Sequence, residues 1–281
     1  MSKMNKPKFS VALCVYKNDK PEWFEQALHS IIEQTLKPDE IVLVVDGPVD
    51  ALLEAVIRRH EMLLSNFRVL RLPRNMGLGI ARKIGIENCL NELIALMDSD
   101  DLSLPNRFEK QCTEFSKDPE LAVLGAQIAE FKNEANNIIG IRKVPLTDIE
   151  IKNYLKFRCP FNQVTVMFRK SSVLNAGGFL DWFSNEDYFL WIRMMLINCK
   201  FANLPEVLVK VRVDENQYSR RGGRRYFASE AKLQKYMYAN RIISYSQCFY
   251  NIAIRLLVQI IMPNWLRAFV FKTLFRNRNK S

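Results

Sequence analysis

The sequence contains only two histidines, His29 and His60, in 281 residues. Both lie in stretches with helical spacing, so we expect surface or packing roles for them, not histidine-based catalysis or metal binding. The six cysteines are scattered along the chain, with no CxxC pair. This spacing argues against a zinc site or a disulfide framework and favours a reducing, cytosolic compartment.

Long apolar runs are also missing. No stretch reaches the roughly 20 uncharged apolar residues that a membrane span requires, and the best candidate, residues 248–262, is interrupted by Arg255 and Gln259. The basic start of the chain leads into a strand-like segment, not into the apolar core of a signal peptide. With 48% hydrophobic and 25% charged residues, the chain is expected to be globular.

Acidic residues are scarce in the last quarter of the chain. Residues 216–281 contain 13 Lys or Arg and a single acid, Glu230, whereas the other 215 residues carry 28 bases and 29 acids. The whole net charge of +11 therefore comes from the C-terminal part. This asymmetry predicts an anionic partner there, either membrane lipid or a phosphate-bearing substrate.

The first hundred residues alternate short apolar segments with stretches of helical spacing. Strands are expected at residues 9–15, 41–45, 67–72 and 93–97, and helices at residues 21–34, 51–64 and 79–90. Apolar strands that alternate with helices predict an α/β fold, with a mainly parallel sheet covered by helices on both faces.

After residue 107 the pattern is less regular. Strands are expected at residues 121–128, 138–142, 164–168 and 207–213, the first two as an antiparallel portion of the sheet, and helices at residues 171–176 and 186–197. Beyond residue 216 the sequence is basic, aromatic and helical in its spacing. We therefore expect a first domain at residues 1–215 and a basic helical extension at residues 216–281.

Polar residues follow each of the first four predicted strands. These groups are residues 16–19, Asp46-Gly47, Arg74-Asn75 and residues 98–101. In open α/β sheets, ligands bind outside the carboxyl ends of the strands. The sequence therefore predicts a site at this edge of the sheet.

Asp98 and Asp100 form a DxD sequence after the fourth predicted strand. In an extended segment, alternate side chains face the same way, and two carboxylates on one side suit Mg²⁺ or Mn²⁺. An isolated DxD is weak evidence, and its position at the end of a buried strand strengthens it. For Asp101 the alternative is an N-cap before a helix at residues 102–111.

Two further segments of the sequence are candidates for a functional site, one for binding phosphate and one for a role of its carboxylates. Asn75 and Gly77 precede a helix that carries Arg82 early in its length, and the N–H groups of such a helix attract phosphate. The alternative is a plain turn before a helix. Glu186-Asp187 opens another predicted helix, where acids are favourable at an N-terminus whether or not they have a chemical role.

In this order, the groups resemble glycosyltransferase family 2, with its nucleotide-binding GT-A fold. The resemblance covers roughly residues 10–213. The members of the set are Tyr16-Lys17-Asn18, Asp46-Gly47, Asn75-x-Gly77 with Ala81-Arg82, Asp98-Ser99-Asp100-Asp101, Gly177-Gly178-Phe179, and Glu186-Asp187 with Trp191.

The resemblance implies a metal-dependent, inverting transfer from a nucleotide sugar. Asp187, with Glu186 beside it, matches the catalytic base; Asp100 matches the direct ligand of Mn²⁺ or Mg²⁺, and Asp98 a ribose or metal contact. The other matched positions belong to the donor site: Tyr16 and Asn18 for base and ribose, Asp46 for uracil, Asn75 in the glycine-containing turn, and Arg82 near the diphosphate or the aspartates.

The segment Arg220-Arg221-Gly222-Gly223-Arg224-Arg225 combines flexible glycines with guanidinium groups that bind phosphate in a bidentate manner. Similar sequence occurs in a bacterial branch of the family that builds O-antigen and exopolysaccharide repeat units. The resemblance implies transfer of glucose or galactose from UDP, in β1,3 linkage, to N-acetylglucosamine on undecaprenyl diphosphate. Arg220 and Arg221 would bind the diphosphate of either donor or acceptor.

From residue 245 onward, aromatic and aliphatic residues mix with Arg and Lys. This pattern predicts interfacial helices on an anionic bilayer. The resemblance implies that this bilayer is the bacterial inner membrane, at its cytoplasmic face. The alternative is a helical unit that packs on the core and presents a basic outer face. Two other functions remain as alternatives: a nucleotidyltransferase of related fold, and a nucleic-acid-binding protein with a basic tail, although no nucleic-acid motif is present.

Overall fold

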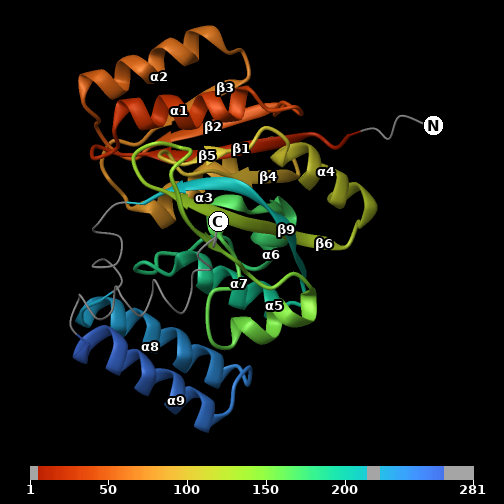
Figure 1. The fold of residues 1–281 in the computed structure, drawn as a ribbon, viewed down its shortest axis with the longest axis vertical. Coiled ribbons are helices and arrows are strands. Elements are labelled where there is room, and N and C mark those ends of the chain that lie inside the picture. Colours follow the sequence, from red (N-terminus) through yellow and green to blue (C-terminus); the bar gives the residue numbers. More distant parts are fainter. Residues whose placement is uncertain (1–5, 214–221, 263–281) are drawn as a thin grey trace.

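A computed structural model describes residues 6–213 and 222–262. In these residues nine strands form a mixed sheet in the order β3-β2-β1-β4-β8-β6-β9-β5, with β7 paired to β6 (Figure 1). The strands are β1 Phe9–Val15, β2 Glu40–Val45, β3 Phe67–Arg71, β4 Leu93–Leu96, β5 Leu102–Ser103, β6 Leu121–Phe131, β7 Ile138–Arg142, β8 Met167–Arg169 and β9 Lys200–Arg212.

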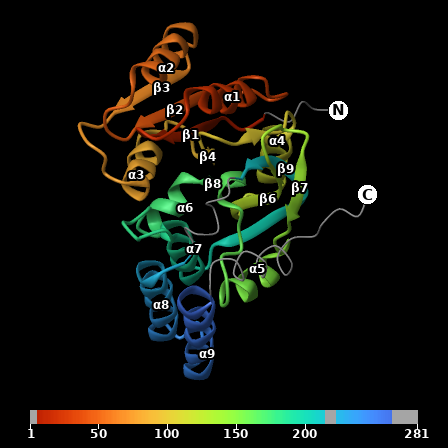
Figure 2. The same cartoon turned by 60° about the vertical axis from the view of Figure 1, so that its left-hand side comes forward.

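The helices flank both faces of the sheet (Figures 1 and 2). Their bounds are α1 Pro21–Ile32, α2 Ala51–Leu63, α3 Leu78–Asn88, α4 Arg107–Lys117, α5 Asp148–Leu155, α6 Lys170–Asn175, α7 Glu186–Leu196, α8 Arg224–Ala239 and α9 Tyr245–Leu256. One hydrophobic core lies beneath α1, α2 and α4, and a second beneath α3 and α5–α9. In β1, Leu13 belongs to the first core and Ala12 to the second, because successive side chains of a strand face opposite ways.

The sheet has a parallel half, as the alternating pattern predicted, and a mixed half. β1 pairs in parallel with β2 and β4, and β2 with β3. β8 runs antiparallel to both β4 and β6, β7 runs antiparallel to β6, and β9 runs parallel to β6. The parallel half brings the carboxyl ends of β1, β2 and β4 to one edge.

Three predicted elements differ in the structure. Residues 163–165 form a 3₁₀ helix before β8, because the Thr165 hydroxyl donates to the Asn162 carbonyl and accepts from the Ala126 N–H. The helix predicted at residues 102–111 begins only at Arg107, because Leu102 and Ser103 pair with β9 as a strand. The last strand is longer than predicted and begins at Lys200, because β9 pairs with β6 over most of its length.

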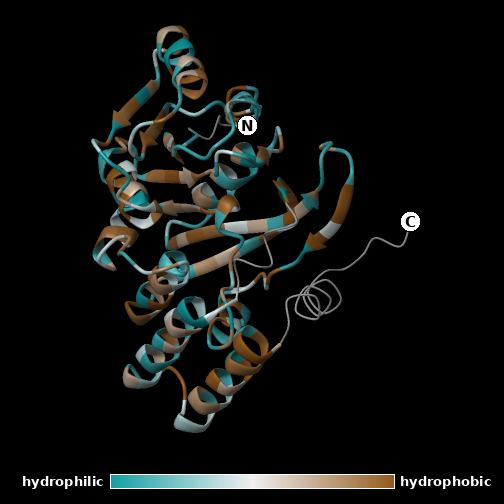
Figure 3. Ribbon diagram, turned by 90° about the vertical axis from the view of Figure 1, so that its left-hand side faces the viewer, coloured by the Kyte–Doolittle hydropathy of each residue, from teal (hydrophilic) through white to brown (hydrophobic). Residues whose placement is uncertain are grey.

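The C-terminal helices α8 and α9 lie at the end of the molecule opposite α2 (Figures 1 and 2). Leu233 and Met237 of α8 belong to the same core as Trp191 of α7. In Figure 3 hydrophobic residues gather toward the C-terminal end of α9. Among residues 6–213 and 222–262, no helix combines the length and apolar character that crossing a bilayer requires.

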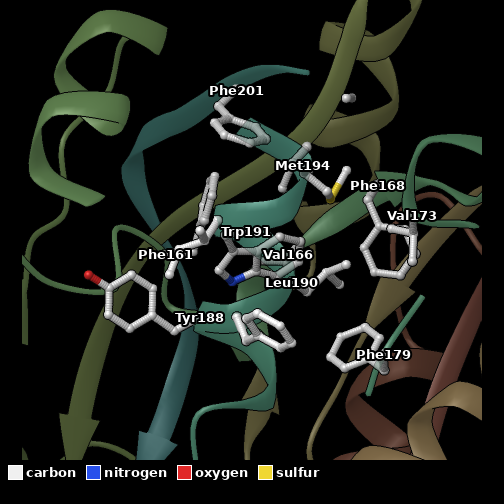
Figure 4. Packing of buried hydrophobic residues seen from close by; sticks show 14 of the residues in the cluster. Phe161, Val166, Phe168, Val173, Phe179, Tyr188, Leu190, Trp191, Met194 and Phe201 are labelled. Atoms are coloured by element: carbon white, nitrogen blue, oxygen red, sulfur yellow. The ribbon is translucent and has the colours of Figure 1, made fainter. Parts of the chain in front are cut away.

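Trp191 fixes helix α7 in the second core. Figure 4 shows its indole surrounded by Phe161, Phe179 and Leu190. The Phe161 and Trp191 ring centroids are 5.2 Å apart, in an edge-on arrangement that aromatic pairs favour. The first residues of α7, Glu186 and Asp187, are therefore carried by a helix that is anchored one turn further along.

Candidate functional site

A pocket of about 410 Å³ opens at the carboxyl ends of β1, β2 and β4, at the edge that the sequence predicted. The groups that follow these three strands come together there with the first turns of α3. Its polar lining residues are Cys14, Tyr16, Asp19, Asp46, Asn75, Arg82, Asp98, Ser99 and Asp100. A concave site of this size with a few convergent polar groups is typical of small-molecule binding.

Asp46, at the end of β2, shapes one wall of this pocket. Its two carboxylate oxygens accept hydrogen bonds from the N–H groups of Met76, at 2.6 Å, and Gly77, at 3.0 Å. The Asn75 side chain donates to the Asp46 carbonyl at 3.2 Å. Asp46 therefore holds the turn before α3 against the end of β2. Its contact to the uracil ring of a nucleotide stays a prediction.

Gly47 allows this close approach of two loops. Its φ is +86°, and a Cβ at this position would lie 2.5 Å from the Asn75 amide nitrogen. Gly77 has a similar φ of +90°, but a Cβ there would meet nothing within 4 Å. A residue with a Cβ would strain the backbone at either position. Only at Gly47 would its Cβ also clash with the backbone of the neighbouring loop.

We expect Gly47→Ala to destabilise the protein more than Gly77→Ala. The second variant should cost only the backbone strain, about 1–3 kcal/mol, and the first should add the displacement of the Asn75 backbone. Urea denaturation of both variants measures the difference in the free energy of unfolding. Equal losses would show that the loop at Asn75 yields freely and that the close approach is not needed.

The three acidic residues after β4 lie in two places: two of them line the pocket and the third contacts β9. Ser99 and Asp100 lie in a turn, so the extended geometry predicted for residues 98–100 is wrong. Asp98 and Asp100 both line the pocket. Asp101 accepts a hydrogen bond from the Arg212 N–H at 2.8 Å and so joins β9; the N-cap interpretation of Asp101 is therefore wrong.

Arg212 fixes this turn from the other side. Its Nε donates to the Asp100 carbonyl at 3.1 Å, and its guanidinium lies 4.8 Å from the Trp23 ring centroid and 4.7 Å from that of Phe131. The sequence analysis did not select Arg212. Its only sequence signal is a cation at the end of an apolar strand, and its partner Asp101 lies 111 residues away.

The pocket concentrates negative charge. Burial, with the neighbouring charges of Asp98 and Asp19, raises the pKa of Asp100 to about 6. Burial also raises the pKa of Asp19 to about 6, against a backbone hydrogen bond from Tyr16 that lowers it. Asp19 is a pocket residue that the sequence analysis passed over, whereas the selected Asn18 is exposed and does not line the pocket.

The donor set of this pocket fits a hard divalent cation. In the part of the chain that the structure describes, no three or more His, Cys, Asp or Glu side chains are arranged to hold a metal by protein ligands alone. Mg²⁺ and Mn²⁺ need fewer, because they are commonly held by one or two carboxylates together with substrate phosphates and water. Asp98 and Asp100 supply such carboxylates, and a bound cation would offset the repulsion between their negative charges.

Arg82 of α3 connects the pocket to helix α7. It is 7% exposed, and its two terminal nitrogens contact Asp98 Oδ1 at 2.9 Å and Glu186 Oε1 at 2.8 Å. Burial by itself would lower the pKa of Arg82, but Asp98 and Glu186 raise it above its ordinary value. The guanidinium is therefore a fixed charge between the two acidic groups that the sequence singled out.

Asp187 lies next to this bridge, in the first turn of α7. Its Oδ1 accepts from the Tyr188 N–H at 2.6 Å, and the Cys159 thiol lies 3.7 Å from its Oδ2. Burial raises the pKa of Asp187, and burial with the charge of Asp187 raises that of Glu186. A carboxylate with a raised pKa is a stronger base than one in water, which suits proton abstraction.

The basic segment predicted to bind phosphate is only partly described. Arg220 and Arg221 lie outside the described residues. Arg224 and Arg225 are exposed in the first turn of α8, and the Arg225 guanidinium lies 4.0 Å from the Phe183 ring centroid. This end of α8 is thus close to the segment that leads into Glu186.

The family profile described as "Glycosyl transferase family 2" matches residues 10–178. The match includes all the residues that line the pocket, up to Asp100, and ends before helix α7. "Amylovoran biosynthesis glycosyltransferase AmsE" of Erwinia amylovora is 40% identical over 81% of this chain and 84% of its own length. "UDP-Gal:alpha-D-GlcNAc-diphosphoundecaprenol beta-1,3-galactosyltransferase" of Escherichia coli is 35% identical over 96% of this chain and 97% of its own.

Among solved structures, residues 1–349 of S. aureus TarS in complex with UDP-GlcNAc superpose with a TM-score of 0.66 and 17% sequence identity. The match covers 94% of this chain and 81% of that one. At this identity the likeness concerns the fold alone, and it confirms the expected GT-A arrangement of a mixed sheet flanked by helices.

Proposed function

Since the chain belongs to glycosyltransferase family 2, we propose that it transfers glucose or galactose from a UDP-sugar to an amino sugar on a polyprenyl diphosphate. The product would be a β1,3-linked unit of an O-antigen or exopolysaccharide. The name of the Escherichia coli relative supports this donor, acceptor and linkage, because the match runs over nearly the whole of both chains. The glycosyltransferase activity itself follows from the family.

The observation that carries the proposal is the bridge of Arg82 between Asp98 and Glu186. One end of this bridge lies in the donor pocket, and the other lies beside Asp187. A transferase that displaces a diphosphate from one face of a sugar needs a base on the opposite face. The arrangement supplies a leaving-group side and a base side at a fixed separation.

On the donor side, we assign Asp100 and Asp98 to holding Mn²⁺ or Mg²⁺ together with the diphosphate. The ion would neutralise the negative charge that grows on the departing nucleotide. Tyr16, Asp46 and Asn75 line the part of the pocket where the nucleoside would bind. Arg82 keeps Asp98 in place and adds a fixed positive charge near the phosphates.

On the acceptor side, Asp187 takes the proton of the attacking hydroxyl in this proposal. Glu186 is bound to Arg82, so its role is to hold the guanidinium, and Asp187 is the better candidate for the base. The hydroxyl oxygen attacks the anomeric carbon as the bond to the diphosphate breaks. This direct displacement inverts the anomeric configuration.

One assay tests the proposed function. The purified protein is offered UDP-glucose, UDP-galactose and their N-acetyl forms with a synthetic N-acetylglucosamine-diphospho-lipid, with and without Mn²⁺. We expect a disaccharide-lipid and free UDP with one of the first two donors. Release of pyrophosphate would instead indicate a nucleotidyltransferase, and no product with any donor would remove the proposal.

We also propose that α9 rests on an anionic membrane, where a lipid-linked acceptor lies. Its exposed apolar residues are Tyr245, Phe249, Tyr250, Ile254 and Leu256. Cations such as Lys232, Lys235 and Arg241 lie in α8 and in the turn after it. Apolar side chains beside basic ones are typical of helices that bind anionic bilayers in their interface.

We expect Phe249→Glu to reduce binding to vesicles that contain phosphatidylglycerol. Phe249 is 67% exposed, and burial of a phenylalanine side chain in the bilayer contributes roughly 1.5–3 kcal/mol, or about tenfold or more in the partition coefficient. Leu52→Glu is the matched control, because Leu52 is 73% exposed on α2 at the opposite end of the molecule. Co-sedimentation that is unchanged in Phe249→Glu, or equally weakened in both, would contradict this orientation.

A further inference from the structure

Asn185 occupies the N-cap position of α7 but does not cap the helix with its side chain. Asparagine is among the preferred N-cap residues because its oxygen accepts from the first N–H groups. Here its Nδ2 instead donates to the Ser229 hydroxyl of α8 at 3.1 Å. Ser229 in turn donates to the Phe183 carbonyl at 2.6 Å. Asn185 is 5% exposed and Ser229 8%, so water does not compete freely for this pair.

The segment at residues 180–185 contacts α8 at two further points. The Lys232 ammonium lies 4.2 Å from the Trp182 ring centroid, and the Arg225 guanidinium 4.0 Å from that of Phe183. Each is a cation–π contact. One helix of the C-terminal pair thus holds both the backbone and the side chains of the segment that enters α7.

This segment does not adopt its conformation by local preference alone. Ser184 has a φ of +56°, in the left-handed region that a residue with a Cβ seldom occupies. Such a conformation persists where surrounding contacts impose it. The contacts from Ser229 to Phe183 and Asn185 lie on either side of Ser184, and Asp187 follows two residues after Asn185.

We propose that α8 is a positioning element for the base, and that Ser229 is its principal positioning residue. Through Phe183 and Asn185 it sets where α7 begins and hence where the Asp187 carboxylate lies relative to the donor pocket. This inference rests on the proposed function, because it takes Asp187 as the base. The C-terminal helices then serve catalysis even when no membrane is present.

The test uses the full chain in detergent-free buffer with a water-soluble acceptor, N-acetylglucosamine diphosphate on a short alkyl chain. Ser229→Ala, Asn185→Ala and the double variant are compared with the wild type. We expect kcat to fall roughly ten- to a hundredfold, with the affinity for UDP unchanged. The double variant should be no worse than Ser229→Ala, because both substitutions remove one shared contact.

Ser246→Ala is the matched control, since Ser246 is an exposed serine of α9 whose hydroxyl lies 2.9 Å from the neighbouring Ser244 hydroxyl. It should leave kcat unchanged. If Ser229→Ala does not fold, Asn185→Ala alone decides by the same readout. Wild-type kcat in both variants, or effects that multiply in the double variant, would overturn the inference. A wild type that uses no UDP-sugar would overturn the proposed function and this inference with it.

Discussion

Asp187→Asn is expected to reduce the rate of transfer by about 10²–10⁴-fold, the usual contribution of a general base. The amide has the same shape as the carboxylate and can still accept from the Tyr188 N–H, but it cannot take a proton from the acceptor hydroxyl. UDP binding should persist, because Asp187 does not line the donor pocket. Initial rates of UDP release and isothermal calorimetry with UDP measure the two quantities.

Asp181→Asn is the control for this prediction, because Asp181 is an exposed carboxylate just ahead of the same helix. It should retain wild-type activity. The activity of Glu186→Gln should fall between those of Asp187→Asn and Asp181→Asn, since this substitution weakens the contact with Arg82 but leaves the base in place. Substantial transfer by Asp187→Asn, with Glu186→Gln inactive, would move the base to Glu186.

Asp100→Asn is expected to lower transfer by at least about a hundredfold, because it removes a carboxylate from the position where diphosphate charge must be stabilised. Burial and neighbouring acids raise the pKa of Asp100 to about 6, so its neutralisation should also relieve repulsion. We therefore expect the variant to be at least as stable as the wild type while it loses Mn²⁺-dependent UDP binding. Thermal denaturation and calorimetry with and without Mn²⁺ separate the two effects.

Asp118→Asn is the matched control, since Asp118 forms a surface ion pair with Lys200 far from the pocket. Its UDP affinity should equal that of the wild type. If chelation of divalent ions leaves the wild-type rate unchanged, the assignment of Asp100 and Asp98 to a metal is wrong. Asp98 would then act by orienting Arg82.

Arg82 joins the pocket to the segment that carries the proposed base. It lies in α3, behind the glycine-containing turn, and its side chain crosses from Asp98 to Glu186. A buried guanidinium with two carboxylate partners has a defined geometry, because removal of either partner would leave charge unpaired at large cost. The Arg82 side chain thereby links the pocket directly to the first residue of α7.

The C-terminal helices fit one of the two expectations that the sequence presented as alternatives, and the other stays a prediction. Leu233 and Met237 pack into the core with Trp191, as the core-packing alternative required. Phe249 and Tyr250 of α9 remain exposed, and binding of this face to a membrane stays a prediction. Because a helix has two faces, one side can join the core while the other is available to lipid.

Much of the parallel half was predictable from local pattern. β1 was expected at residues 9–15 and is observed there, and β2 and β3 differ by a single residue at one end. Buried parallel strands are continuous apolar runs with polar residues after them, which a sequence displays directly. The mixed half was harder because β5 has only two residues and β8 only three, and each exists through its pairing with a longer strand.

The sequence by itself determined which residues follow the strand ends, and so it placed Asp46, Asp98 and Asp100 at one edge. Only the tertiary structure decided which side chains from distant parts of the chain come into contact. Arg82 reaches Glu186 across 104 residues, and Asp101 turns to Arg212 across 111. Hydrophobic period and turn chemistry act over a few neighbouring residues, whereas the partner of a buried charge is whichever group the completed fold brings within hydrogen-bond distance.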